Sequence, residues 1–172
     1  MQHKQPKRLN IGSGQRPFGP GWTNVDINPR WNPDVLADAA SMPMFEDATA
    51  DLIVAHHVIE HVGLGEFDGA VRECHRVLRP GGSLIITTPD LDALVRGWIE
   101  QRLTDYLFCV QLYGAYMDNE ADRHKWLYTK QTLAKAVGNA AQWEKLLPFD
   151  WGRIDGADIA RDWYILGLEA VK

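Results

Sequence analysis

Two short stretches of this sequence decide its fold: Leu9-Asn10-Ile11-Gly12-Ser13-Gly14, and then Asn24-Val25-Asp26-Ile27. The first is an apolar run that breaks into glycines, and the second is an apolar run that ends in a carboxylate. In a parallel α/β sheet, such glycines let backbone N–H groups approach a nucleoside-bearing cofactor, and the acid accepts hydrogen bonds from ribose hydroxyls. The pair therefore predicts a site for an adenosyl cofactor.

The connection between these stretches is unusually short. Only Gln15 to Trp22 separates the two expected strands, and these eight residues include two prolines and two glycines. Parallel strands need a crossover, usually a helix, and this composition disfavours one. We expect an irregular loop in place of the first crossover helix. Phe18 and Trp22 then either cover the sheet face or form an exposed patch for a homodimer.

The overall composition fits one soluble globular domain over residues 1–172. Of the 172 residues, 45% are apolar and 24% are charged, and the net charge of −5 argues against a nucleic-acid partner. Cys74 and Cys109 are too few for a disulfide scaffold, and the N-terminal residues are polar. No apolar run approaches the roughly 20 residues of a membrane span. We therefore expect a cytoplasmic protein without a membrane partner.

Hydrophobic periodicity predicts strands that alternate with helices. The apolar runs expected to form buried strands are Leu9–Ile11, Thr23–Ile27, Leu52–Ala55 and Ser83–Thr87. Between the last two, a helix is expected over Glu66–Leu78, ended by Pro80-Gly81-Gly82. Its buried stripe is expected to contain Phe67, Val71, Cys74 and Leu78. The alternation is typical of a doubly wound, mostly parallel sheet, whose ligand site lies at the carboxyl ends of the strands.

The second half of the chain is expected to cover this sheet and to complete it. Residues 92–128 form a predicted helical, aromatic cover that includes a charged loop over Met117–Lys125. The residues expected on its first apolar face are Leu91, Leu94, Val95, Trp98 and Ile99, and Tyr116 is among the aromatic residues that follow. Thr129 is predicted to cap a helix to about Ala136. Lys145–Phe149 and Asp162–Val171 are predicted to form a closing antiparallel hairpin.

Several motifs follow one another in a fixed order along the first half of the chain. After the two opening stretches come Ala37-Asp38-Ala39, the run Asp51 to Val62, and Leu78-Arg79-Pro80-Gly81-Gly82. This series resembles the class I S-adenosylmethionine-dependent methyltransferases, particularly the ubiquinone-biosynthesis-like type 11 group. The resemblance implies a Rossmann-like sheet of seven strands, one of them antiparallel, with S-adenosylmethionine as cofactor and a small molecule as methyl acceptor. His124 to Thr129 resembles the group more loosely.

The resemblance assigns the methionine end of the cofactor to the glycine loop and to the end of the third predicted strand. Gly12 and Gly14 leave room for the methionine moiety, and the Ser13 N–H is a candidate donor to its carboxylate. His56 is expected nearby. The simpler alternatives are a tight turn without a ligand, and a histidine that is hydrogen-bonded at a strand terminus.

The adenosine part is assigned to two further places. Asp26 is expected to accept from the ribose hydroxyls, and Ile27 to offer an apolar surface to adenine. Asp38 and Ala39 are expected at the exocyclic amine of adenine. As alternatives, Asp26 and Asp38 merely cap turns.

His57 and His61 are the predicted catalytic bases, because an imidazole can take the proton of a hydroxyl acceptor near neutral pH. His124 is a weaker third candidate. The consecutive prolines with an aromatic that mark amino-methylating members are absent after Leu52–Ala55. An oxygen or carbon acceptor is therefore expected.

The same stretch also contains a rival motif. His57-Val58-Ile59-Glu60-His61 spells H-x-x-E-H, in which two histidines one helical turn apart bind zinc and the glutamate activates water. Such a site needs a third ligand and a long helix, whereas Gly63-Leu64-Gly65 would end a helix within about one turn. No metal site is therefore predicted.

Two other function classes remain open at this stage. A binding or scaffold module can keep the fold without the activity. A nicotinamide-dependent oxidoreductase can use a similar glycine turn, although Gly12 to Pro17 lacks the third glycine of G-x-G-x-x-G.

Overall fold

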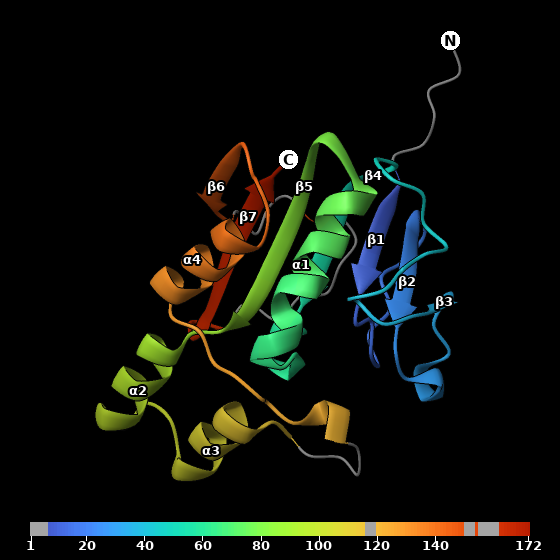
Figure 1. The fold of residues 1–172 in the computed structure, drawn as a ribbon. Helices are drawn as coiled ribbons and strands as arrows, with labels where there is room; N and C mark the ends of the chain where they lie inside the picture. Colours follow the sequence, from blue (N-terminus) through green and yellow to red (C-terminus); the bar gives the residue numbers. More distant parts are fainter. Residues whose placement is uncertain (1–6, 116–119, 150–153, 155–161) are drawn as a thin grey trace.

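A seven-stranded sheet with the order β3-β2-β1-β4-β5-β7-β6 forms the centre of the computed structural model (Figure 1). The structure describes residues 7–115, 120–149, 154 and 162–172. The strands are β1 (Arg8–Ile11), β2 (Trp22–Asp26), β3 (Val35–Leu36), β4 (Ala50–His56), β5 (Leu78–Pro89), β6 (Lys145–Pro148) and β7 (Ile165–Val171). Because β7 runs antiparallel to both β5 and β6 while the other pairs are parallel, the predicted mixed sheet with one antiparallel strand is confirmed.

Helices cover one face of the sheet and its carboxyl end. The α-helices are α1 (Leu64–Val77), α2 (Leu91–Ile99), α3 (Asp105–Tyr113) and α4 (Lys130–Ala140). Short 3-10 helices are η1 (Pro29–Trp31), η2 (Ile59–His61) and η3 (Glu120–Asp122). Figure 1 shows α1 and α4 side by side against one face, and α2 and α3 beyond the ends of the parallel strands. No helix in the described part of the chain is long and apolar enough to span a bilayer.

The predicted stripe of α1 is buried as expected. Phe67, Val71 and Cys74 are at most 5% exposed, and they join the main apolar cluster with Leu78. The predicted boundary between helix and strand was wrong, since Leu78 begins β5 by pairing with Ala50 instead of ending α1. Pro80, Gly81 and Gly82 lie inside the long strand, where Gly81 has a φ of +76° and the register shifts between the pairs at Ala50 and Leu52.

No helix forms between β1 and β2, as predicted. Phe18 is buried against the sheet residues Val54 and Ile85 and meets Trp22 edge to face at 4.9 Å. The Asn24 side chain fixes this loop, because its Oδ1 accepts from the Phe18 N–H (2.8 Å) and its Nδ2 donates to the Phe18 carbonyl (3.1 Å). Phe18 therefore covers the sheet instead of forming an exposed patch, and the homodimer stays a prediction.

The expected apolar face of α2 was partly wrong. Leu94 is fully buried, but Val95 and Ile99 are 38% and 68% exposed. The helix lies across the end of the sheet and buries a narrower stripe, which includes Gly97. The Trp163 ring packs against Gly97, in the space that a larger side chain would need.

The C-terminal elements follow the prediction closely. The Thr129 hydroxyl accepts from the Thr132 N–H (3.2 Å) and caps α4, which runs one turn beyond the predicted end. The predicted hairpin forms as β6 and β7. Tyr116, Met117 and the polar N-terminal residues 1–6 lie outside the described residues.

Candidate functional site

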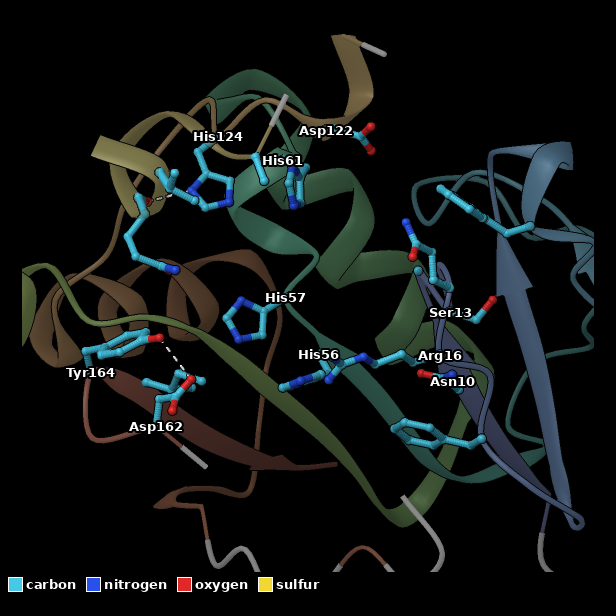
Figure 2. A pocket seen from close by; sticks show the side chains of 18 residues that line it. Asn10, Ser13, Arg16, His56, His57, His61, Asp122, His124, Asp162 and Tyr164 are labelled. Atoms are coloured by element: carbon cyan, nitrogen blue, oxygen red, sulfur yellow. Dashed lines mark hydrogen bonds between the residues drawn. The ribbon is translucent and has the colours of Figure 1, made fainter. Parts of the chain in front are cut away.

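A cleft opens at the carboxyl ends of β1, β2 and β4, between the glycine loop and a group of histidines (Figure 2). It consists of three adjoining hollows of about 490, 210 and 250 Å³. Gly12 and His61 line all three. The cleft therefore has a glycine wall, residues 10–28, and a histidine wall, residues 56–61 with 111–115 and 120–124.

The glycine wall depends on backbone that other residues adopt poorly. Gly12 and Gly14 have φ angles of +65° and +50°. A Cβ on Gly12 would lie 2.5 Å from Val58 Cγ2, whereas a Cβ on Gly14 meets nothing closer than 4.0 Å. Position 12 thus requires glycine for two reasons: its positive φ and the close packing of Val58 against it.

One predicted contact of this wall needs correction. The Ser13 N–H donates to the Val25 carbonyl at 3.1 Å, so it is already used within the fold and not offered to a ligand carboxylate. Ser13 still lines the largest hollow, as does Asn10, and its place in the cofactor site stays a prediction.

Asp26 ends β2 and is only 7% exposed. Its Oδ2 accepts from the Gly14 N–H and its Oδ1 from the Asn28 N–H, both at 2.8 Å, so the turn-cap interpretation is correct. Each carboxylate oxygen has a second lone-pair direction. Because Asp26 also lines two of the hollows, capping the loop and accepting from a ribose are compatible.

The 210 Å³ hollow brings together the residues expected around adenine. Asp26, Ile27, Asp38 and Ala39 all line it. Ile27 is 58% exposed just beyond β2, which leaves its apolar side chain available to a flat ring. The Asp38 Oδ1 caps the Ala40 N–H at 2.8 Å, so this residue also has a local structural role.

The histidine wall begins where β4 ends. His56 is its last residue, and the Nδ1 of its ring is hydrogen-bonded to Thr87 Oγ1. Burial, reinforced by the neighbouring His57, lowers the pKa of His56 to about 3, so this ring is neutral near pH 7. His57 follows with φ +54°, a strained conformation for a non-glycine residue, which turns the chain sharply.

A buried carboxylate lies beneath His57. Glu60 is fully buried; its Oε1 is 2.9 Å from His57 Nδ1, and its Oε2 accepts from Thr88 Oγ1 at 3.0 Å. Burial alone would raise the pKa of Glu60, but the hydrogen bond from His57 and the nearby His61 hold it below the usual range. An ionised carboxylate only accepts, so His57 Nδ1 is the donor, and the second ring nitrogen, Nε2, is left for another partner.

His61 and His124 meet although 62 residues separate them. Their rings lie edge to face with centroids 4.8 Å apart. His61 Nδ1 lies 3.1 Å from the Arg123 carbonyl, and His124 Nδ1 lies 2.7 Å from the Gln111 carbonyl. Burial also lowers the pKa of His124. In Figure 2 both rings stand above His57 at the same cavity.

The H-x-x-E-H helix does not form. Only Ile59–His61 is helical, as one 3-10 turn, and His57 lies outside it in a left-handed conformation. The pairing of His57 and His61 one helical turn apart is therefore absent.

The largest hollow is also lined by residues for which the sequence predicted no role in the site. The Tyr164 hydroxyl donates to Asp162 Oδ2 at 2.9 Å, and burial with this hydrogen bond raises the pKa of Tyr164 to about 12. Arg16 and Asp122 line the same hollow (Figure 2). The sequence predicts no role for Glu60 outside the zinc motif. The one local feature that could have drawn attention to this residue is a charge directly after the apolar pair Val58-Ile59.

The fold and cleft define an α/β protein built to hold a nucleoside-bearing ligand at the carboxyl ends of parallel strands. A family model described as a methyltransferase domain matches residues 22–86. A probable S-adenosylmethionine-dependent methyltransferase of Mycobacterium tuberculosis is 28% identical over 145 residues, which cover 71% of this chain and 51% of that protein. The chain thus spans about half the length of the curated relatives it matches.

Solved structures agree in fold. An S-adenosylmethionine-dependent methyltransferase from Archaeoglobus fulgidus matches with a TM-score of 0.61 and 16% identity, over 98% of this chain and 87% of that chain. A phosphoethanolamine N-methyltransferase from Haemonchus contortus, solved with S-adenosylhomocysteine, matches with a TM-score of 0.60 and 15% identity, over 98% of this chain and 50% of that chain. These matches support the predicted resemblance to the class I S-adenosylmethionine-dependent methyltransferases of the type 11 group: residues 22–86 match the methyltransferase-domain model, and the fold is the one that these solved structures share.

Proposed function

We propose that this chain binds S-adenosylmethionine in the cleft and transfers its methyl group to an oxygen or carbon atom of a small molecule. The observation that carries the proposal is the His57–Glu60 pair, since it places an oriented base beside a cleft suited to an adenosyl cofactor. The family match supports the cofactor. The absence of the amino-methylating proline signature supports the acceptor atom.

The residues around the cleft fit the cofactor. Gly12 lines all three hollows, and its lack of a side chain lets Val58 pack closely against the loop there. Asp26 offers its remaining lone pairs to the ribose, and Ile27 with Asp38 and Ala39 surrounds the space for adenine. His56, being neutral, lines the methionyl end without adding charge.

When bound, S-adenosylmethionine supplies an activated methyl group, because the sulfur leaves as a neutral thioether and needs no proton. The protein has to align the acceptor, exclude water and remove the acceptor's proton. His57 Nε2 lies on the ring edge opposite the Glu60 contact, so it can take that proton. Glu60 then stabilises the imidazolium and keeps the ring in the correct tautomer. His61, which lines the same hollow, is the second candidate.

Calorimetry tests the cofactor part. We expect S-adenosylhomocysteine to bind one to one and NAD to give no heat. No heat with S-adenosylhomocysteine would support the scaffold alternative, and heat with NAD alone would support an oxidoreductase.

A set of acceptors tests the reaction. Phenols, carboxylic acids and 1,3-dicarbonyl compounds are compared with primary amines, with S-adenosylhomocysteine formation as the readout. We expect product with oxygen or carbon acids. Product with amines alone would contradict the proposed acceptor atom.

A further inference from the structure

Three potential metal ligands converge at the top of the histidine wall. Glu60, His61 and His124 each place one ligand atom within 4.8 Å of the other two. The first two come from the segment after β4, and the third comes from the segment that precedes α4. Neither sequence segment shows such a set by itself.

The hydrogen bonds of both histidines leave the same nitrogen available. A backbone carbonyl only accepts, so the Nδ1 atoms of His61 and His124 must carry the protons that they donate to Arg123 and Gln111. Each neutral ring then has its lone pair on Nε2. An Nδ1–H donated to a carbonyl is the usual outer contact of a histidine that ligates a metal through Nε2.

Glu60 supplies the charge that such a site needs. Its carboxyl group is fully buried, and each of its oxygens accepts one hydrogen bond, from His57 or from Thr88. Each oxygen therefore keeps a lone pair for a cation. A buried carboxylate is costly unless it is paired or coordinates a metal, and both histidines place a ligand atom within 4.8 Å of it.

We propose that Glu60, His61 and His124 bind a first-row divalent cation, with zinc as the reference ion. Two imidazoles and one carboxylate form a donor set that suits zinc and its neighbours and excludes a calcium-type oxygen cage. Ligand atoms bound tetrahedrally at about 2.1 Å lie about 3.4 Å apart, so side-chain movements of roughly 1 Å close the cluster. This set differs from the H-x-x-E-H arrangement, because His124 replaces His57.

The position of the site suggests what the ion does. His61 and His124 line the largest hollow, so an ion held by them would border the proposed acceptor space. Such an ion would act as a Lewis acid that makes a hydroxyl acceptor more acidic, and His57 would remain the group that takes the proton. This role, unlike the metal site itself, rests on the proposed methyl transfer.

Metal titration tests the site directly. The full chain, freed of metal with a chelator, is titrated with zinc chloride by calorimetry and with cobalt chloride by visible absorption. We expect one ion per chain, a cobalt spectrum of low coordination number, and at least a tenfold weaker affinity in His61→Ala and in His124→Ala.

His75→Ala is the matched control. His75 is hydrogen-bonded through Nε2 to the Gln142 carbonyl on another part of the surface, so its removal should leave zinc affinity unchanged. The proposal is overturned if the wild type binds no zinc up to 100-fold above the protein concentration, or if the double variant His61→Ala/His124→Ala binds zinc as the wild type does.

S-adenosylhomocysteine is titrated into the same samples. Zinc binding without S-adenosylhomocysteine binding would support the metal site and refute the proposed methyl transfer. The reverse result would refute the metal site and leave the methyl transfer standing.

Discussion

The two walls of the cleft are built in different ways. The glycine wall comes from one continuous stretch, residues 10–28, and its shape depends on backbone conformation at Gly12 and Gly14 and on the cap that Asp26 provides. The histidine wall joins residues 56–61 to residues 111–115 and 120–124, and side-chain hydrogen bonds to Glu60 and to two distant carbonyls hold it together. The first wall is therefore local in sequence, whereas the second depends on tertiary packing.

This difference separates the expected effects of substitution. Changes in the glycine wall should alter loop conformation and cofactor affinity together, because the same groups serve both. Changes at His57, the proposed base of the histidine wall, should affect the reaction more than the cofactor affinity. The five predictions that follow test that separation.

The largest effect is expected at His57. Replacing it by Gln removes the base but keeps a polar side chain, so kcat with the best acceptor of the panel should fall about 10²- to 10⁴-fold. The affinity for S-adenosylhomocysteine should change less than about twofold, because His57 is not among the residues assigned to the cofactor. An unchanged kcat in both His57→Gln and His61→Gln would remove the base role from this wall.

Gly12→Ala should strongly destabilise the protein. A left-handed residue with a Cβ costs about 1–2 kcal/mol, and the overlap with Val58 adds roughly 1–3 kcal/mol. Gly14→Ala is the control. Gly14 also has a positive φ, but a Cβ there would meet open space, so this variant should lose only the about 1–2 kcal/mol that the left-handed conformation costs. Urea unfolding of both variants measures the difference in their free energies of unfolding. Equal losses would show that the Val58 side chain moves aside at little cost.

Asp26→Asn should weaken S-adenosylhomocysteine binding by about 10- to 100-fold, because hydrogen bonds to a charged acceptor contribute roughly 1.5–3 kcal/mol. Asp38→Asn, at an exposed position with its own turn cap, should lose less. Calorimetry with both variants ranks the two acids. A larger loss at Asp38 would reassign the principal adenosine contact.

His56 should make stability depend on pH. In the unfolded chain its imidazole takes up a proton near pH 6.5, whereas the folded ring, buried beside His57 and Arg16 with Glu60 opposing them, does not until about pH 3. Unfolding therefore takes up a proton below pH 6.5, and stability is lost as the pH falls. Between pH 7 and 5 the wild type should lose about 2 kcal/mol more than His56→Asn in urea unfolding. Parallel losses would contradict the depressed pKa of His56.

The smallest effect is expected at Tyr128, which packs under the histidine wall against Phe67. Its hydroxyl is buried and has no hydrogen-bond partner among the described residues. Tyr128→Phe should therefore leave the free energy of unfolding within about 1 kcal/mol of the wild type, or raise it. A loss above about 2 kcal/mol in thermal or urea unfolding would point to a partner for the hydroxyl.

Sequence reasoning succeeded where the deciding interactions are close along the chain. The stripe Phe67, Val71 and Cys74 follows from helical spacing, and the absent crossover helix follows from the prolines and glycines between β1 and β2. The predicted end of the helix at Leu78 and the predicted burial of Val95 were wrong. Leu78 pairs with Ala50, a distant partner, and the exposure of Val95 depends on how α2 lies across the sheet.

The candidate site divides in the same way. Gly12, Gly14 and Asp26 could be predicted because a glycine turn and a strand-ending acid are local features with few conformational solutions. The contacts of Glu60 could not, since whether a glutamate is buried and what it meets depends on β5, which supplies Thr88, and on the segment that brings His124 beside His61.

The sequence by itself determined the strand and helix alternation, the glycine loop and the acid at the end of β2, because hydrophobic spacing and backbone freedom act over a few residues. The assembly of His57, Glu60, His61 and His124 was settled only by folding. Their proximity requires elements far apart in the chain to pack together, and no local pattern encodes that packing.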